Sequence, residues 1–109
     1  MIETVYQLAQ TDEKTIKPII MDENLHYMHM ILNQDEALPL HYSNSNVYMN
    51  VLRGTLSIGL GEEEVRHYER GALLKIPVDT KMNVHNTHEE TLEITVVKAP
   101  APGAPAKMA

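Results

Sequence analysis

Short runs of alternating apolar and polar residues, separated by glycines, dominate the chain between residues 25 and 97. Alternation with a period of two places one set of side chains on each face of an extended strand. No long window shows the one-turn spacing of an amphipathic helix, except residues 2–9, where one short helical turn is expected. Many short strands with glycines between them favour a β-sandwich or barrel over alternating strands and helices.

The alternation predicts individual strands. They are residues 25–32, 47–52, 55–60, 65–68, 72–76 and 91–97. The first of these runs is apolar on both faces, which is typical of an interior strand. Gly54 joins two of the runs, and the acidic residues 62–64 interrupt the pattern as a solvated hairpin turn does. We therefore expect an all-β domain.

The size and composition of the chain fit one domain. It has 109 residues, of which 43% are hydrophobic and 22% charged, so it can build a single core. We assign residues 1–98 to this domain. Residues 99–109 are rich in proline and alanine and are expected to form a flexible tail, because such a segment can neither donate ladder hydrogen bonds nor build a core.

Charge and cysteine content exclude several classes of function. Fifteen acidic and nine basic residues give a net charge of −6, which repels phosphate backbones and anionic lipids, so neither nucleic acid nor a membrane is an expected partner. There are no cysteines, which excludes disulfides, thiolate chemistry and cysteine metal ligands. Because no segment has the pattern of a spanning helix or a signal peptide, a cytoplasmic location is expected.

Two segments, residues 41–54 and 71–86, resemble the two sequence motifs of the cupin superfamily. The glycine, proline and asparagine positions that shape the scaffold of this family keep their spacing. They are Gly54, Gly71, Pro77 and Asn86. The resemblance implies a double-stranded β-helix, which is a jelly-roll barrel, with a ligand pocket between its two sheets.

The resemblance also places the family's metal site, and most of the donors are replaced there. The four positions are occupied by His41, Ser43, Val47 and Met82. Iron, manganese, nickel and zinc sites need several converging nitrogen or carboxylate donors. One imidazole beside a hydroxyl and a thioether does not supply them, so no metal cofactor is expected. If a divalent metal is bound, His41 is its expected ligand.

His41 is the main candidate for function, because the resemblance points it into the mouth of the barrel and an imidazole can donate, accept or act as a base. Alternation aims Ser43 and Ser45 the same way, so they would form a hydrogen-bonding wall for a polar ligand. Such serines also bond to nearby backbone in loops. Met82 would face inward from the opposite strand, where it would line a pocket or fill a gap in the core.

Two hypotheses about function follow. The first is a binding module that holds a small polar molecule between His41, Ser43, Ser45 and Met82 without the usual metal. The second is a metal-dependent cupin enzyme of the isomerase or oxygenase type, with an atypical site in which His29 or His85 joins His41. This second hypothesis requires two imidazoles within about 4 to 5 Å of each other, because metal–nitrogen bonds are about 2.0 to 2.1 Å long. The sequence names no reaction.

The outer face of the barrel is a candidate interface. Tyr48 is expected on that face, because Val47 and Met49 alternate with it, and tyrosine suits interfaces. Short β-domains also expose sheet edges and apolar faces that need covering. The resemblance implies that a homodimer forms. A third hypothesis, a structural or regulatory subunit, predicts a pocket filled by side chains.

Overall fold

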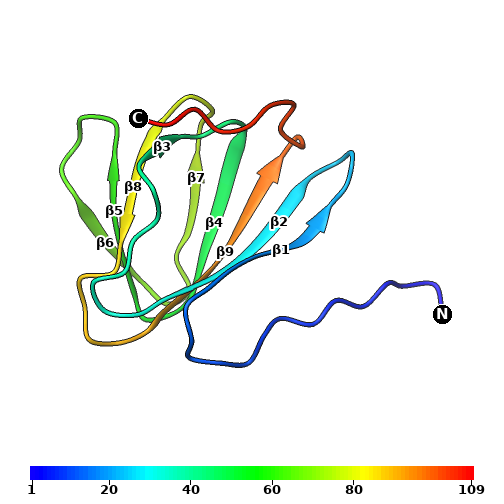
Figure 1. The fold of residues 1–109 in the computed structure, drawn as a ribbon, viewed down its shortest axis with the longest axis horizontal. Coiled ribbons are helices and arrows are strands. Elements are labelled where there is room, and N and C mark those ends of the chain that lie inside the picture. Colours follow the sequence, from blue (N-terminus) through cyan, green and yellow to red (C-terminus); the bar gives the residue numbers. More distant parts are fainter.

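The computed structural model describes residues 1–109, and all of its regular elements are β-strands (Figure 1). The strands are β1 (Thr15–Met21), β2 (His26–Leu32), β3 (His41–Tyr42), β4 (Asn46–Arg53), β5 (Thr55–Leu60), β6 (Arg66–Glu69), β7 (Leu73–Ile76), β8 (Lys81–His85) and β9 (Leu92–Ala99). No helix long and apolar enough to cross a membrane is present.

The strands form two antiparallel sheets that enclose the core. One sheet has the order β1-β2-β9-β4-β7, and the other has the order β3-β8-β5-β6. Figure 1 shows β5, β6 and β8 of the smaller sheet on the left and most of the larger sheet on the right. This arrangement confirms the predicted all-β class and the double-stranded β-helix.

The core consists of the alternating apolar residues that face between the sheets. Its buried members are Met30, Leu32, Val47, Met49, Val51, Leu56, Ile58, Ile76, Met82, Val84, Leu92, Ile94 and Val96. On β4, for example, every second residue belongs to this set, and the residues between them are less buried. The period-two pattern therefore predicted which face of the strand is buried.

The predicted helical turn at residues 2–9 is wrong. This segment is extended and leads away from the barrel (Figure 1), with Ile2, Val5 and Tyr6 exposed. So short a helix is marginal in water unless its apolar side packs against the rest of the protein. These side chains have no such packing, so the helical spacing alone is not enough.

Three strands, β3, β8 and β1, lie outside the runs predicted from the alternation. The longest of them is β1. Its pattern is broken by Pro18, which cannot donate a ladder hydrogen bond. The strand lies at the edge of the larger sheet and pairs only with β2, and a register shift follows Pro18. An edge position tolerates the missing donor.

Gly54 makes the tight passage from β4 to β5. Its φ angle is +78°, and a Cβ atom there would overlap the carbonyl oxygen of Thr91. Glycine alone adopts this conformation without strain and leaves room for the neighbouring backbone. This explains why a glycine at the end of β4 is part of the scaffold pattern.

Residues 99–109 return along the upper end of the barrel in Figure 1. The amide of Tyr42 donates to the carbonyl of Lys107 at 2.8 Å, and Met108 forms an isolated β-bridge with His41. The amide of Ala109 also donates to the carbonyl of Leu40 at 3.2 Å. The segment thus covers the open edge of β3. Its flexibility stays a prediction.

Candidate functional site

Two rows of inward-facing side chains meet at the upper end of the barrel. In the larger sheet the row of cross-strand neighbours is His26, Lys98, Val47 and Ile76. In the smaller sheet the row is His41, Met82 and Leu60. Because cross-strand partners point to the same face, and Val47 and Met82 belong to the buried core, both rows face the interior.

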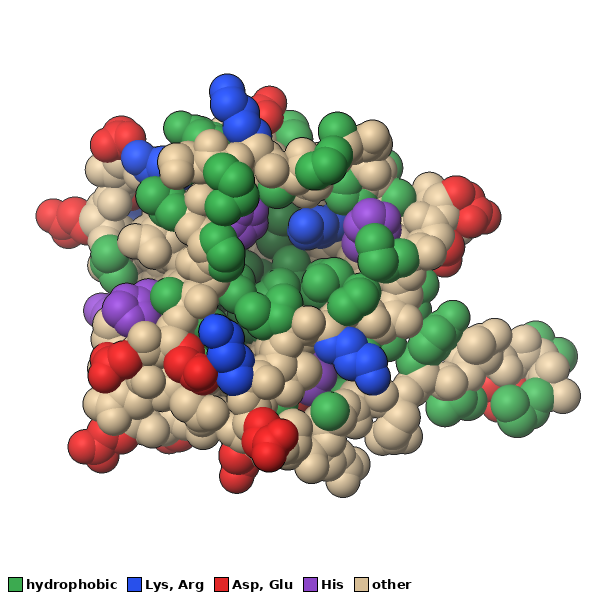
Figure 2. Space-filling view, viewed as in Figure 1, with side chains coloured by type: hydrophobic (Ala, Val, Ile, Leu, Met, Phe, Trp, Pro, Cys, Tyr) green, Lys and Arg blue, Asp and Glu red, His purple; other side chains and the backbone are tan.

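This end of the barrel is hollowed. Figure 2 shows a depression near the middle of the visible face, over β4 and β9 of Figure 1. Hydrophobic side chains form its floor, and Lys or Arg and His side chains stand on its rim, whereas acidic side chains gather at the periphery. A pocket with an apolar floor and a few polar groups is the usual form of a small-molecule site.

His41 belongs to the row of the smaller sheet that faces the interior. Its Nδ1 atom is 2.7 Å from the carbonyl oxygen of Pro39. A carbonyl only accepts, so Nδ1 carries the hydrogen and Nε2 remains for another partner. The side chain is half-buried and sits opposite Met82, which is 3% exposed. The structure therefore brings these two predicted site residues together.

The hydroxyl of Ser43 is already used by the protein. It donates to the carbonyl of Pro77 at 2.7 Å and accepts from the amide of Thr80 at 2.9 Å, and the side chain is 2% exposed. These bonds close the turn between β7 and β8. Ser43 thus shapes the site through this turn.

The hydroxyl of Ser45 is likewise engaged. It donates to the carbonyl of Pro100 at 2.5 Å, and the side chain is 5% exposed. This bond fastens the start of the C-terminal segment to the loop before β4. Both serines therefore bond to backbone groups, which is the structural role considered for them above. These backbone groups are far away in the sequence, however.

The two histidines suggested as partners of His41 lie elsewhere, so that part of the enzyme hypothesis is wrong. His29 is on the outer face of β2 and contacts Glu93, because Met28 and Met30 occupy the inner face. His85 is on the outer face of β8, because Met82 and Val84 point inward. The inward-facing histidine of β2 is His26, the cross-strand neighbour of Lys98.

The four positions of the family's metal site do not fit a metal ion. Ser43 bonds to backbone, and Val47 and Met82 pack in the core, which leaves one imidazole nitrogen of His41. No group of three or more His, Asp or Glu side chains is arranged to hold a metal. A single nitrogen does not satisfy the coordination of zinc or a similar ion.

Lys98 is the residue that the sequence analysis missed. On β9, Leu92, Ile94 and Val96 point into the core, and Lys98 continues the same face at the mouth. Burial lowers the pKa of its amine below the ordinary value of 10.5. The side chain makes no ion pair. The sequence contains a signal for this position, because Lys98 follows Val96 by two residues and so falls on the same face as the three apolar residues.

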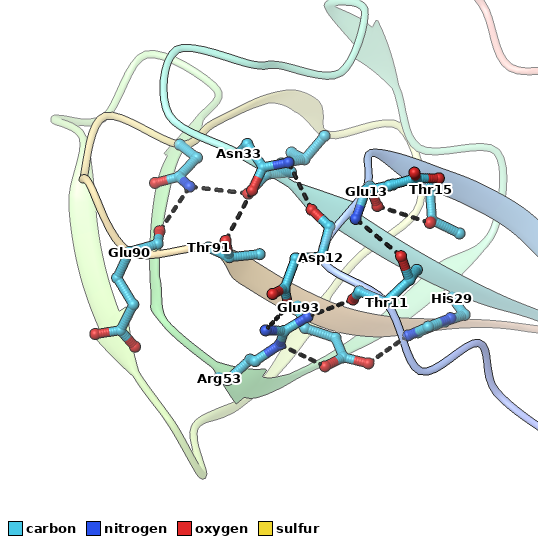
Figure 3. Close-up of polar contacts among 12 residues, drawn as sticks. Thr11, Asp12, Glu13, Thr15, His29, Asn33, Arg53, Glu90, Thr91 and Glu93 are labelled. Carbon is cyan, nitrogen blue, oxygen red and sulfur yellow. Dashed lines mark hydrogen bonds and ion pairs between the residues drawn. The ribbon is translucent and has the colours of Figure 1, made fainter.

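The outer face of the same sheet carries a cluster of paired charges (Figure 3), in which Nδ1 of the buried His29 has no hydrogen-bond partner. Glu93 contacts His29 at 2.6 Å and accepts from Nε of Arg53 at 2.8 Å, and Arg53 also contacts Asp12 at 2.6 Å. Burial raises the pKa of Glu93, but the bonds from His29 and Arg53 outweigh it, so the pKa lies below 4.5. The bond to Asp12 raises the pKa of Arg53. This cluster fastens the N-terminal segment to the sheet.

A second outer cluster surrounds Ser57 on the smaller sheet. Its hydroxyl lies 2.7 Å from Nδ1 of His67 and 3.1 Å from Nε2 of His88. The serine is 2% exposed and is covered by the two imidazoles. Although a serine bonded to histidine is typical of nucleophilic sites, this hydroxyl does not face open solvent.

Comparison with known proteins gives relatives that match nearly the whole chain. No protein-family model matches. An uncharacterised protein of Methanocaldococcus jannaschii is 33% identical over 103 residues, which cover 94% of this chain and 89% of the relative. The crystal structure of this same protein, an RmlC-like cupin family protein with a double-stranded β-helix fold, has a TM-score of 0.90, with 33% identity and 94% coverage of both chains.

More distant structures share the fold. An uncharacterised protein with a double-stranded β-helix domain from Klebsiella pneumoniae has a TM-score of 0.79 at 15% identity, covering 95% of this chain and 85% of its own. An RmlC-like cupin protein from Desulfovibrio desulfuricans has a TM-score of 0.73 at 21% identity, covering 92% and 97%. With the near-complete match to the archaeal cupin, these findings show that the chain belongs to the cupin superfamily.

Proposed function

We propose that this cupin binds a small molecule in the mouth of its barrel, in contact with His41 and Met82, and without a metal at the family's usual positions. The observation that carries the proposal is the hollow at this end, where nitrogen-bearing side chains surround an apolar floor. Binding sites for small molecules usually combine a mostly apolar lining with a few polar groups that fix orientation.

Each predicted site residue has a part in this proposal. The free Nε2 atom of His41 supplies a hydrogen-bonding group at the rim, and Met82 supplies a polarizable apolar surface beside it. Ser43 and Ser45 act indirectly, because their hydroxyls hold the turn before β8 and the C-terminal segment in place. We therefore expect their loss to weaken binding by loosening the walls of the mouth.

The test compares metal content with bound small molecules. The chain is purified without chelators, metals are measured by elemental analysis, and small molecules released on denaturation are identified by mass spectrometry. We expect far less than one iron, manganese, nickel or zinc per chain, and a released molecule that is lost in His41→Ala. His85→Ala is the matched control, because His85 lies on the outer face of β8.

A different result would favour the enzyme hypothesis. Near-stoichiometric metal that disappears in His41→Ala but persists in His85→Ala would reject the proposed binding mode and support a metal-dependent cupin with an atypical site around His41. Absence of any bound or added small molecule that perturbs the mouth would reject small-molecule binding itself.

We also propose that the chain forms a homodimer. Tyr48 lies on the outer face of β4, where the Lys75 ammonium is 5.9 Å from its ring centre, and the extended N-terminal segment exposes Ile2 and Val5. Apolar groups left uncovered in this way favour association. Light scattering coupled to size-exclusion chromatography should give twice the chain mass, and a monomer mass at micromolar concentration would contradict the proposal.

A further inference from the structure

We infer that the ligand of the barrel mouth is a small organic carboxylate, whose anionic group pairs with the amine of Lys98 and whose apolar part rests on the inner face of the barrel. This inference rests on the proposed function and names the chemical class of the ligand. Three observations support the inference: the position of Lys98, the lack of a partner for the charge of Lys98, and the groups around this side chain.

The register fixes the position of Lys98. It is the cross-strand neighbour of His26 on one side and of Val47 on the other. Val47 is fully buried in the core, and cross-strand neighbours share a face, so the lysine stem runs along the interior. The amine therefore stands at the boundary between the apolar floor and the open mouth.

No group of the protein neutralises this amine. The ion pairs of the chain involve His29, Arg53 and Lys81, and Lys98 takes part in none of them. It also makes no side-chain hydrogen bond, although it is half-buried and burial lowers its pKa. A half-buried charge without a partner is unfavourable, and a bound anion would remove this penalty.

The cavity beside Lys98 is lined by no carboxylate, although the carboxylate of Asp22 interacts electrostatically with the neighbouring His26. A cavity of about 430 Å³ lies beside it and is bounded by Met21, His26, Asn44, Lys98 and residues 102–106. None of these residues is acidic, although the whole chain carries a net charge of −6. The lining of this cavity is thus basic on an acidic protein, which favours an anion over a cation.

The mixture of groups favours a carboxylate with an apolar body. One amine with neighbouring imidazoles can neutralise a single negative charge, whereas phosphate sites usually gather several donors. Met21 and residues 102–106 supply the apolar part of the cavity lining next to the charge, whereas Val47 and Met82 are buried in the core. The C-terminal residues 102–106 also line the cavity, so they would contact the bound molecule.

The test uses a matched pair of probes. 4-Methylpentanoate carries a carboxylate, and 4-methylpentanamide has nearly the same shape without the charge; inorganic phosphate is the third probe. Binding to the full chain is measured by isothermal titration calorimetry, and the site is located by the methyl NMR signal of Met82. We expect the carboxylate to bind and to shift this signal, and to bind more tightly than the amide and phosphate.

Variants of Lys98 test whether its positive charge binds the carboxylate. Lys98→Met should weaken carboxylate binding at least about tenfold, because a hydrogen bond to a charged group is lost, and should leave amide binding unchanged. Lys98→Arg retains the positive charge and should keep most of the affinity. Lys17→Met removes an exposed lysine of β1 and should have no effect.

The outcomes separate this inference from the proposed function. If the amide binds as tightly as the carboxylate, or if Lys98→Met changes nothing, the role of Lys98 is refuted while binding in the mouth stands. If phosphate binds most tightly, the carboxylate class is refuted. If no probe shifts the Met82 signal, both the inference and small-molecule binding at this site fail.

Discussion

Strand β9 carries two charged side chains whose environments differ in an instructive way. Glu93 points outward and is paired with both His29 and Arg53, whereas Lys98 points inward at the mouth and is paired with nothing. Burial acts on both groups, but only at Glu93 do the protein's own partners outweigh it. The outer charges therefore serve the fold, and the inner one remains available for a ligand.

The proposed site lies beside the family's metal positions, where most of the donors are replaced. At the family positions, Val47 and Met82 have become part of the core, while the neighbouring strand places an amine beside Val47. Of the metal positions, only His41 keeps a polar group at the mouth, and the larger sheet adds Lys98 and His26. The outer cluster, in contrast, is closed by internal contacts.

The largest expected effect comes from breaking the outer cluster. Arg53→Met leaves Glu93 and Asp12 without their cation and should lower the free energy of unfolding by about 2 to 3 kcal/mol, less than for a fully buried pair because the Arg53 side chain is 36% exposed. Urea denaturation at pH 7 measures it. Lys81→Met, which breaks the exposed pair with Glu62, should change stability by less than about 1 kcal/mol. Equal losses of stability in the two variants would contradict a stabilising role of the Arg53 cluster beyond that of an exposed ion pair.

The second prediction concerns pH. Because the pKa of Glu93 is lowered in the folded protein, its ionised form stabilises the fold above the ordinary value of 4.5, and this contribution disappears as pH falls through the lowered pKa. Wild type should therefore exceed Glu93→Gln in stability by a constant amount from pH 6 to 8 and lose this advantage in acid. Parallel stability curves of the two proteins down to pH 3 would show that Glu93 is not the titrating group.

At the mouth, substitution of the charged residue is expected to increase the free energy of unfolding. Lys98→Met should raise the free energy of unfolding, on the order of 1 kcal/mol, because an unpaired, half-buried charge is replaced by an apolar side chain of similar length. Since the pKa of Lys98 is lowered, the difference should be full at pH 7 and shrink as pH rises towards 10.5. Thermal unfolding of both proteins measures it, and a destabilised variant would mean that Lys98 has an internal partner.

The smallest effect sharpens the role of the C-terminal segment as a wall of the mouth. Ser45→Ala removes the bond to the Pro100 carbonyl and should lower stability by about 1 kcal/mol. Hydrogen exchange at the Tyr42 amide, which donates to Lys107, should become faster, while the amides of β5 keep their rates. Unchanged exchange at Tyr42 would show that the segment is held without Ser45.

The scaffold was predictable from the sequence because its signals are local. Alternation identified the buried faces of β4 and β9, and Gly54 marked a backbone position that excludes any Cβ atom. The inward position of Lys98 was within reach by the same parity, since it follows Val96 by two residues on one strand. A charged residue at the end of an apolar stripe is therefore a signal for a site.

The rest depends on contacts between segments far apart in the sequence. Ser45 bonds to Pro100, and Ser43 bonds to Pro77, so their engagement is visible only once these segments meet. The choice between His26 and His29 depends on which face of β2 turns inward, and that strand is apolar on both faces. Local patterns do not contain this information.

The most direct test of the account is a crystal structure of the chain with 4-methylpentanoate. The account predicts a carboxylate oxygen about 2.7 to 2.9 Å from the Nζ atom of Lys98, with the apolar part of the molecule against Met82. Lys98 bonded instead to a carboxylate of its own chain, or a metal ion coordinated by His41 in the same space, would contradict it.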